Sequence, residues 1–527
     1  MPGVEHDRMR TLGDVLRYHA GRSPAAVALS FEGIDTTFAT LDQRADAVAA
    51  GLIDLGIGPG DRVGYLAKNS DAFFEIFLGC VRIGAVVTPV GWRLGDDEIV
   101  YILQDAGVRV LFAGRESAPQ VSRLAARLET VATIFALEPV AQDWPLYPVW
   151  RDHKRAVPGV QAVSPSDVAI QLYTSGTTGR PKGAMLSHEN ILLPRQLNAD
   201  AGLAWEQWTV DDVALAAMPV SHLGGSLWPI YAFYWGARVS VVREFSPAQL
   251  LDHIRDDGVS ILFIVPSALQ IVLRDPRVAT TDFSRVRHML YGASPIPLDL
   301  LREAINVIGC GFVQVYGLTE TTGAIVGLGP DDHDLASPAK LASTGRPFPQ
   351  VEISIRSPVG EVLETGEVGE IYVRSPSNMV GYWNLPEATL DAVPAGWLKT
   401  GDAGRLDEDG YLYICDRIKD MIITGGENVY APEVENVLYS HPDVLDAAAI
   451  AVPDARWGEA VKAVIVLRPG ARVDEDGIRQ WCRDRIASFK SPKTVDFVDA
   501  LPRNGTGKVM KHQLREPFWA DVGRRVN

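Results

Sequence analysis

Apolar and polar positions along the first part of the chain predict helices and strands in alternation. Residues 41–55 place apolar side chains at helical spacing directly after Thr40, which predicts a helix capped by that threonine. A strand at 62–66, a helix at 71–83 and a strand at 85–89 follow. This alternation predicts parallel β-sheets flanked by helices.

Three further strands are each followed by a loop of small and hydroxyl-bearing residues. The strand and loop pairs are 168–173 with 174–183, 286–291 with 292–295, and 312–316 with 317–323. Ligands of open α/β sheets bind beyond the carboxyl ends of the strands, so we expect the three loops to border one crevice.

After Ala342 the pattern changes to short alternating runs such as 351–355 and 370–373, which predict a small β-rich subdomain. A charged turn at 416–420, followed closely by Gly425 and Gly426, is typical of a domain boundary with hinge capacity.

The last hundred or so residues carry their own pattern. A helix opens at Pro432, strands follow at 444–452 and 460–467, and Ile478 and Cys482 share one face of a later helix, so Cys482 is predicted to be core. The predicted fold class is α/β: an N-terminal domain (1–418) of parallel α/β sheets with a small β-barrel-like subdomain, then a small mobile α+β C-terminal domain (419–527).

The composition, with 47% apolar and 22% charged residues among 527, is typical of a soluble globular protein with several cores. A net charge of −16 argues against general binding to nucleic acid or anionic lipid. The four cysteines form no Cys-x-x-Cys pair, which favours a reducing cytoplasm over a zinc site or disulfide framework. No signal peptide is expected, and prolines and glycines interrupt the uncharged stretch 213–237, so no integral membrane segment is predicted either.

The loop 174–183 has the composition of a polyphosphate site. It offers hydroxyl donors, glycines that let backbone N–H groups approach an anion, and the positive charge of Lys182. Its spacing differs from the usual phosphate-binding loop, and a flexible surface loop would have a similar composition.

Three single residues have both a functional and a structural interpretation. Glu320 stands alone in a hydroxyl-rich loop and suits Mg²⁺ on phosphate oxygens, or it is a solvated turn residue. His222 lies among small and apolar residues, as structural histidines usually do, and Lys508 stands on a glycine-flexible loop that could be a plain turn.

Five segments together resemble the adenylate-forming superfamily, specifically its acyl-CoA synthetases. They occur in the family's order across nearly the whole chain: YTSGTTGRPKG at 173–183, YGLTE at 316–320, TGD at 400–402, DRIKD at 416–420 and NGTGK at 504–508. The resemblance implies an enzyme that uses ATP, Mg²⁺ and coenzyme A, with a small C-terminal domain that rotates between two half-reactions.

The resemblance also implies residue roles. Thr319 would contact the α-phosphate, Glu320 would hold the metal, and Asp402 would accept hydrogen bonds from the ribose hydroxyls. The implied catalytic residues are Lys508, Glu320, Thr319 and His222. The implied ATP- and AMP-binding residues are Thr174, Ser175, Gly176, Thr177, Thr178, Gly179, Lys182, Gly292, Ala293, Ser294, Tyr316, Gly317, Asp402 and Arg417.

Domain rotation is implied for the second step. Lys508 would bridge the carboxylate and α-phosphate oxygens during adenylation and then swing out about a hinge at Lys419. Gly425 and Gly426 would then border the tunnel for coenzyme A, and His222 matches a family position near the acyl carbonyl.

The expected substrate is an apolar monocarboxylic acid. The resemblance implies that it lacks an α-amino group, because amino-acid-activating members carry an aspartate in the segment that matches residues 218–226, and no acid stands there in this sequence. A fatty, aryl-alkanoic or steroid-derived acid fits this pattern. The predicted function is an acid–CoA ligase; the alternative is an enzyme that loads the acyl-adenylate onto a carrier protein. The sequence leaves open the acyl chain, a homodimer and peripheral membrane association.

Overall fold

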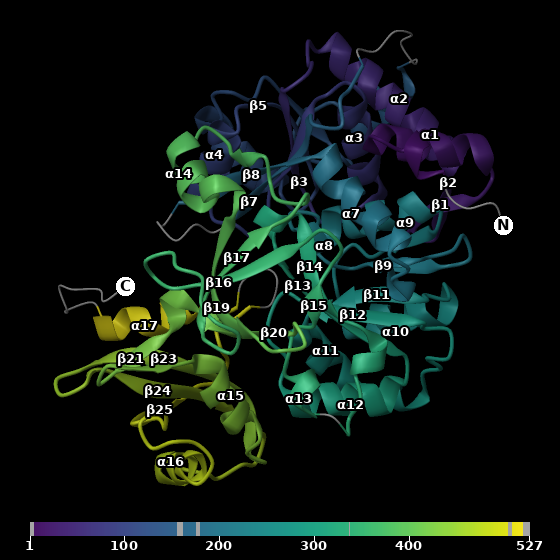
Figure 1. Cartoon of the computed structure of the whole chain (residues 1–527). Coiled ribbons are helices and arrows are strands. Elements are labelled where there is room, and N and C mark those ends of the chain that lie inside the picture. Colours follow the sequence, from purple (N-terminus) through teal and green to yellow (C-terminus); the bar gives the residue numbers. More distant parts are fainter. Residues whose placement is uncertain (1–4, 155–161, 175–179, 337, 504–507, 520–527) are drawn as a thin grey trace.

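The computed structural model describes residues 5–154, 162–174, 180–336, 338–503 and 508–519. Within these ranges, three sheets belong to the chain before residue 418, and a fourth belongs to the chain after it (Figure 1). The predicted α/β class, with a large N-terminal and a small C-terminal part, is confirmed.

The first large sheet has seven strands in the order β18-β8-β7-β4-β3-β5-β6. Its central strands are parallel and buried along their whole length, as expected for strands that helices cover on both faces. The strands are β3 (Arg62–Leu66), β4 (Val86–Pro89), β5 (Val108–Ala113), β6 (Thr133–Ala136), β7 (Val168–Thr174), β8 (Lys182–Ser187) and β18 (Gly381–Tyr382). The helices between them in the chain are α3 (Asp71–Arg82), α4 (Asp96–Asp105), α5 (Ala118–Leu124), η2 (Ala125–Arg127) and α6 (Tyr147–Asp152).

The second large sheet has nine strands in the order β15-β14-β13-β12-β11-β9-β10-β1-β2, with a parallel centre and antiparallel edges. The strands are β1 (Val27–Phe31), β2 (Ile34–Thr37), β9 (Val213–Ala216), β10 (Arg238–Val241), β11 (Ile261–Ile264), β12 (His288–Gly292), β13 (Gly311–Leu318), β14 (Gly323–Leu328) and β15 (Arg346–Pro347). The helices are η1 (His6–Arg8), α1 (Leu12–Arg22), α2 (Phe38–Asp54), α7 (His188–Asp200), η3 (Ala204–Glu206), α8 (Leu223–Ser226), α9 (Trp228–Trp235), α10 (Pro247–Asp256), α11 (Pro266–Leu273), η4 (Pro276–Thr280), α12 (Leu298–Ile308), η5 (Thr319–Thr321), η6 (Pro330–Asp332) and α13 (Pro338–Leu341).

One predicted helix start is wrong. The cap of α2 is Thr37 rather than Thr40, because the Thr37 Oγ1 accepts the backbone N–H of Thr40 at 3.1 Å. The extra residues at the start include Phe38, which is buried in the core, so packing extends the helix beyond its apolar periodicity.

The predicted β-rich subdomain is a four-stranded antiparallel sheet in the order β16-β17-β19-β20. It consists of β16 (Glu352–Arg356), β17 (Gly369–Arg374), β19 (Leu398–Leu406) and β20 (Leu412–Arg417), with α14 (Pro386–Ala392) and η7 (Pro394–Gly396) before β19.

In the described residues after η8 (Ile418–Asp420), the chain forms the fourth sheet and three helices, and these elements gather in a separate lobe of the molecule (Figure 1). They are β21 (Ile422–Thr424), β22 (Glu427–Val429), α15 (Ala431–Tyr439), β23 (Val444–Asp454), β24 (Gly458–Leu467), α16 (Glu475–Arg483), β25 (Thr494–Phe497) and α17 (Lys511–Trp519). The predicted strands and helices of this region are present, and Cys482 is a core residue as expected.

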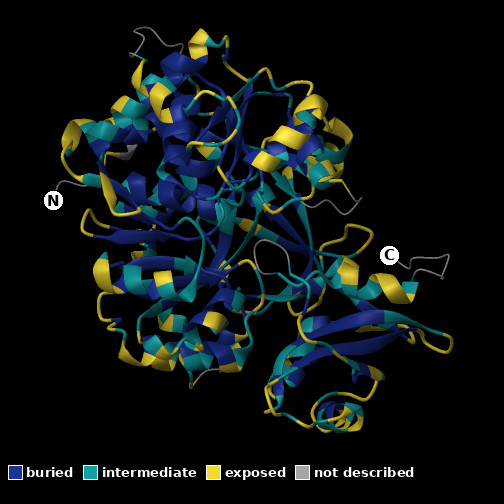
Figure 2. Ribbon diagram, turned by 180° about the vertical axis from the view of Figure 1, so that it is seen from behind, coloured by how far each residue is buried: buried dark blue, intermediate teal, exposed yellow. Residues whose placement is uncertain are grey.

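Buried residues concentrate in the sheet centres (Figure 2). Among the described residues, each hydrophobic cluster lies wholly before residue 418 or wholly after it. None of the described helices is long and apolar enough to cross a bilayer.

Candidate active site

Loops from the two large sheets meet at the carboxyl ends of their strands. Thr174 ends β7 of the first sheet, and Glu320 lies in η5, directly after β13 of the second sheet. The Thr174 hydroxyl donates to the Glu320 carboxylate, with 3.1 Å between Oγ1 and Oε1. This hydrogen bond joins two of the three predicted strand-end loops in one place.

Glu320 has a second donor that the sequence did not indicate. The Tyr382 hydroxyl donates to the same Oε1 at 2.9 Å, and burial, together with the charge of Glu320, raises the pKa of that hydroxyl. The Lys182 ammonium lies over the Tyr382 ring, 5.0 Å from its centroid. Thr174, Lys182, Glu320 and Tyr382 therefore surround one point at the junction of the two sheets.

Tyr382 could not be assigned to the site from the sequence, because its strand is too short to show a pattern. This tyrosine lies on the two-residue strand β18, in which Gly381 and Tyr382 pair antiparallel with Met185 and Ala184 of β8. A strand of this length has no alternating pattern, so only its long-range pairing reveals its position.

A carboxylate that binds a metal ion needs an oxygen that is available to the ion, and the hydrogen bonds of Glu320 show which oxygen that is. Both hydrogen bonds reach Oε1, and among the described residues none reaches Oε2. No group of three or more His, Cys, Asp or Glu side chains in the described part of the chain could hold a metal ion. One carboxylate oxygen fits Mg²⁺, which is commonly held by one or two carboxylates together with substrate phosphates.

The backbone at the end of β13 packs closely against the start of β14. A Cβ on Gly317 would lie 1.8 Å from the carbonyl oxygen of Gly323, so only glycine fits where β13 bends beside β14. Thr322 then turns the chain in the left-handed region at φ 52°, and its hydroxyl donates to the Ser377 carbonyl at 2.7 Å. These contacts hold Thr319 and Glu320 at the end of the strand.

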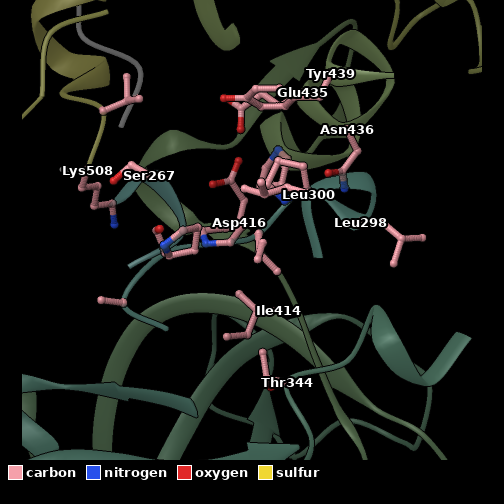
Figure 3. Close-up of a pocket in the computed structure, with 18 of the residues that line it drawn as sticks. Ser267, Leu298, Leu300, Thr344, Ile414, Asp416, Glu435, Asn436, Tyr439 and Lys508 are labelled. Atoms are coloured by element: carbon pink, nitrogen blue, oxygen red, sulfur yellow. The ribbon is translucent and has the colours of Figure 1, made fainter. Parts of the chain in front are cut away.

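A cavity of about 610 Å³ adjoins these strand ends and is lined from both parts of the chain (Figure 3). Ser267 and Thr344 come from the larger part, and Glu435, Asn436 and Lys508 come from the smaller part. The predicted site residues that line the cavity are Ala293, Ser294, Tyr316, Gly317, Asp402, Arg417 and Lys508.

Asp402 is one of five carboxylates in the described part of the chain that line this cavity, together with Asp299, Asp416, Asp420 and Glu435. Asp402 and Arg417 are directly opposed in the β19–β20 pair, and 3.4 Å separates the Arg417 Nε from Oδ1. The Tyr316 hydroxyl donates to Oδ2 at 2.7 Å. Burial and the Asp402 charge raise the pKa of Tyr316 well above its usual value, so this hydroxyl keeps its proton.

Lys508 enters the same cavity from the C-terminal part. Burial, together with the nearby positive charges of Arg417 and Lys419, lowers the pKa of its ammonium to about 8, although Asp402 and Asp420 act in the opposite direction. The pKa of Lys419 is also lowered, mainly by burial and by Arg417. A group of cations this dense is suited to a polyanionic ligand.

Other predicted residues lie outside the lining of this cavity. Gly292 is buried, and Gly425 and Gly426 form the exposed turn of the β21–β22 hairpin. The predicted roles of Ser175, Gly176, Thr177, Thr178 and Gly179 fall outside the described residues.

His222 also lies away from the cavity lining, at the cap of the short helix α8. It is half-buried, and burial lowers the pKa of its imidazole to about 4, so the ring is neutral near pH 7. The turn around it faces Phe263, since a Cβ on Gly224 would lie 3.1 Å from that ring.

The chain has a two-part α/β fold with a cavity lined from both parts, and comparisons with known proteins identify its family. The family model described as "AMP-binding enzyme" matches residues 16–383, and "AMP-binding enzyme C-terminal domain" matches 433–508.

Two curated relatives and one solved structure match along nearly their full lengths. The chain is 40% identical to fatty acid–[acyl-carrier-protein] ligase ScoC of Streptomyces coeruleorubidus, covering 100% of both chains. It is 38% identical to feruloyl-CoA synthase of an Amycolatopsis species, over 97% of this chain and 100% of the relative. The crystal structure of ATP-bound MatB from Rhodopseudomonas palustris superposes with a TM-score of 0.88 at 31% identity, covering 98% of this chain and 100% of that one.

The chain therefore belongs to the AMP-binding enzyme family and is an adenylate-forming ligase of the acyl-CoA synthetase class. The resemblance drawn from its five sequence motifs is confirmed.

Proposed function

We propose that the enzyme activates a hydrophobic monocarboxylic acid with ATP and then transfers the acyl group to coenzyme A. The observation that carries this proposal is the cavity in which Lys508 of the C-terminal part faces Asp402, Arg417 and Tyr316 of the larger part. ATP supplies the activation because a carboxylate is a poor electrophile.

In the proposed first step, a carboxylate oxygen attacks the α-phosphorus of ATP, and the bond to the bridging oxygen breaks with loss of pyrophosphate. Lys508 would stabilise the charge that develops between the carboxylate and the α-phosphate. Thr319 would contact the α-phosphate, and Thr174 and Lys182 would hold the leaving phosphates.

The nucleoside would be held by the neighbouring groups. Asp402 keeps acceptor capacity on both oxygens beside Tyr316 and Arg417, which suits two ribose hydroxyls. Ala293 and Ser294 line the same cavity and would border the adenine. Glu320 would hold Mg²⁺ through its Oε2, and the ion would neutralise phosphate charge.

In the proposed second step, the thiol of coenzyme A loses its proton and attacks the acyl carbonyl, and AMP leaves. We propose domains at 1–418 and 419–527 with rotation about Lys419, which would withdraw Lys508 and bring Gly425 and Gly426 to the site. The hydrophobic clusters that stop on either side of residue 418 support this boundary.

An apolar acid is the proposed substrate class. The turn that would face the acyl group contains no carboxylate from 218 to 226, and its neighbour Phe263 is aromatic. The names of the two relatives, a fatty acid ligase and a feruloyl-CoA synthase, support a substrate of this broad class.

One observation favours a second candidate function. The relative that is 40% identical over its whole length is named as a ligase that uses an acyl carrier protein. The chemistry at the carboxylate would be identical, and the acyl acceptor would be a phosphopantetheine thiol on a carrier protein.

A product assay separates the two candidates. The purified protein is incubated with ATP, Mg²⁺ and a panel of fatty, aryl-alkanoic and steroid acids, with coenzyme A, with a phosphopantetheine-bearing carrier protein, or with neither. Acyl-CoA measured by mass spectrometry supports the ligase and names the acid. Acyl-adenylate that is consumed only when the carrier protein is present supports the second candidate, and no adenylate from any acid contradicts the proposed substrate class.

A further inference from the structure

The irregular segment from Met218 to His222 leads from β9 to α8 and carries the imidazole that the proposal places near the acyl carbonyl. It has no strand or helix of its own to hold it. His222 is tied back to the segment through its N–H, which donates to the Pro219 carbonyl at 3.0 Å. A Cβ on Gly225 would lie 2.2 Å from that same carbonyl oxygen, so the turn after His222 packs directly on the segment. The position of His222 therefore depends on what fixes the backbone at 218–220.

One buried side chain fixes that backbone from the other sheet. Asn69, which follows β3 and is 4% exposed, donates through Nδ2 to the Met218 carbonyl at 2.9 Å and to the Val242 carbonyl at 3.0 Å. Its Oδ1 accepts the N–H of Val220, also at 3.0 Å. Two carbonyls and one N–H face the carboxamide, so this arrangement needs a donor and an acceptor on one side chain, which aspartate cannot supply.

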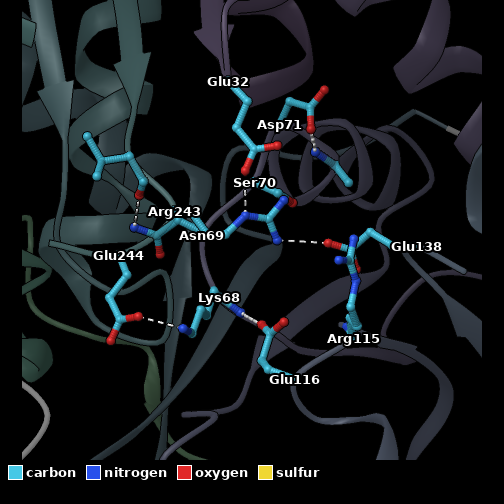
Figure 4. A network of polar contacts seen from close by, with 12 residues as sticks. Glu32, Lys68, Asn69, Ser70, Asp71, Arg115, Glu116, Glu138, Arg243 and Glu244 are labelled. Atoms are coloured by element: carbon cyan, nitrogen blue, oxygen red, sulfur yellow. Dashed lines mark hydrogen bonds and ion pairs between the residues drawn. The ribbon is translucent and has the colours of Figure 1, made fainter. Parts of the chain in front are cut away.

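Hydrogen bonds and ion pairs around Asn69 hold its backbone in place (Figure 4). Its own N–H donates to the Arg243 carbonyl at 3.2 Å. The Arg243 guanidinium pairs with Glu138 at 2.8 Å, and the Lys68 ammonium pairs with Glu244 at 2.5 Å. These polar contacts connect the two large sheets at Asn69. They fix the backbone from which its side chain reaches the segment Met218 to His222.

We propose that Asn69 is a positioning residue for the carboxylic acid substrate: by holding Met218 and Val220 it places His222 beside the acyl group. This inference rests on the proposed function, since it takes His222 as a substrate contact. Asn69 lies outside the lining of the cavity that contains Lys508, so we expect its replacement to affect the acid more than ATP.

The test is Asn69→Asp, which keeps the size of the side chain but turns an oxygen toward two carbonyls. In steady-state assays of pyrophosphate release, we expect the KM for the acid to rise by about ten-fold or more, as for loss of one good contact. The KM for ATP should stay within about two-fold of wild type. Asn69→Ala removes the three hydrogen bonds of the carboxamide without adding repulsion. If the aspartate variant does not fold, the KM values of the alanine variant are measured in its place.

Ser70→Ala is the matched control. Ser70 is buried in the same loop, and its hydroxyl is paired with the Tyr65 hydroxyl at 2.9 Å rather than with the segment 218–222. Its loss should lower the melting temperature and leave the KM for the acid unchanged. A rise in the acid KM in this control equal to that of the Asn69 variants would mean that general destabilisation explains both, and would overturn the proposal.

Combination with His222→Ala separates this inference from the proposed function. We expect His222→Ala to raise the acid KM and Asn69→Asp to add little in that background, because both changes remove one contact. If His222→Ala impairs acid binding and the Asn69 variants do not, or if the two effects add, the Asn69 proposal is overturned alone. If His222→Ala leaves the acid KM unchanged, the substrate contact itself is wrong and the inference falls with it.

Discussion

At the scale of single residues, the charge of Lys508 is set by its surroundings. It shares a cavity with Asp402 and Arg417, and Lys419 is close enough to lower its pKa. A solvated lysine would titrate near its usual value, whereas here the pKa of about 8 lies within the range of ordinary assays.

Replacement of Lys508 by alanine should slow adenylation about a hundred- to a thousand-fold, the usual cost of removing a group that stabilises transition-state charge. Thioester formation from a supplied acyl-adenylate should change far less. The two half-reactions are measured as pyrophosphate release and as acyl-CoA formation. Lys493→Ala is the control, because that ammonium reaches the Ser488 carbonyl at 3.4 Å and lies outside the cavity lining.

The pH dependence of adenylation should follow the same side chain. Lys508 is charged below its pKa of about 8 and neutral above it, so kcat/KM for ATP should fall as pH rises through about 8. Lys508→Arg stays charged in this range and should show no such fall in its residual activity. An unchanged decline in the arginine variant would assign the titration to another group.

At the scale of elements, the junction after β20 is held by charges from three segments. Asp416 of β20 accepts the N–H of Ala431, which opens α15, at 2.8 Å. Arg515 of α17 donates to the Lys419 carbonyl at 3.1 Å and pairs with Asp420 at 3.0 Å. Of these contacts, the one between Asp416 and Ala431 joins the two proposed parts, so rotation about Lys419 would have to release it. The contacts of Arg515 lie within the smaller part and would move with it.

Asp416 should make this junction sensitive to pH. Burial raises the pKa of its carboxyl from 3.8 to about 6, so the folded state binds the proton more tightly than the unfolded chain. Its stabilising contribution, about 3 kcal/mol, is therefore present below about pH 4 and is lost as pH rises through about 6.

Asp416→Asn removes this titration and can still accept from Ala431. Relative to wild type, the variant should gain melting temperature between about pH 4 and pH 7. A difference between the two proteins that does not vary with pH would contradict the assignment. Differential scanning fluorimetry at a series of pH values measures it.

At the scale of the whole molecule, the hydrophobic clusters predict how the chain can be divided. Those before residue 418 and those after it share no member among the described residues. The larger part also holds Asp402 and Arg417, whereas Lys508 comes from the smaller part.

A fragment of residues 1–418 should therefore fold cooperatively and bind a non-hydrolysable ATP analogue, but it should form no acyl-adenylate. Circular dichroism, thermal unfolding and mass spectrometry of the products test these points. An unfolded fragment would place the boundary elsewhere, and a fragment that adenylates at the full rate would contradict the role of Lys508.

Much of the fold could be predicted from local sequence patterns. The predictions that were wrong have physical causes. Strands that helices cover on both faces are continuous apolar runs, so β3, β4 and β7 were predictable. The start of α2 was misplaced because the burial of Phe38, a tertiary contact, extends the helix.

By itself, the sequence determined the family, because the loops that would face the nucleotide keep their residue types and order along the chain. It also determined the α/β class, because hydrophobic periodicity is a local property. Only the tertiary structure brought the Tyr382 hydroxyl to Glu320 and Lys508 close to Asp402. It alone also showed that Asn69 binds the backbone of Met218 and Val220, next to His222. These partners lie tens to hundreds of residues apart in the chain, and their distances depend on how sheets pair and pack, which no local pattern encodes.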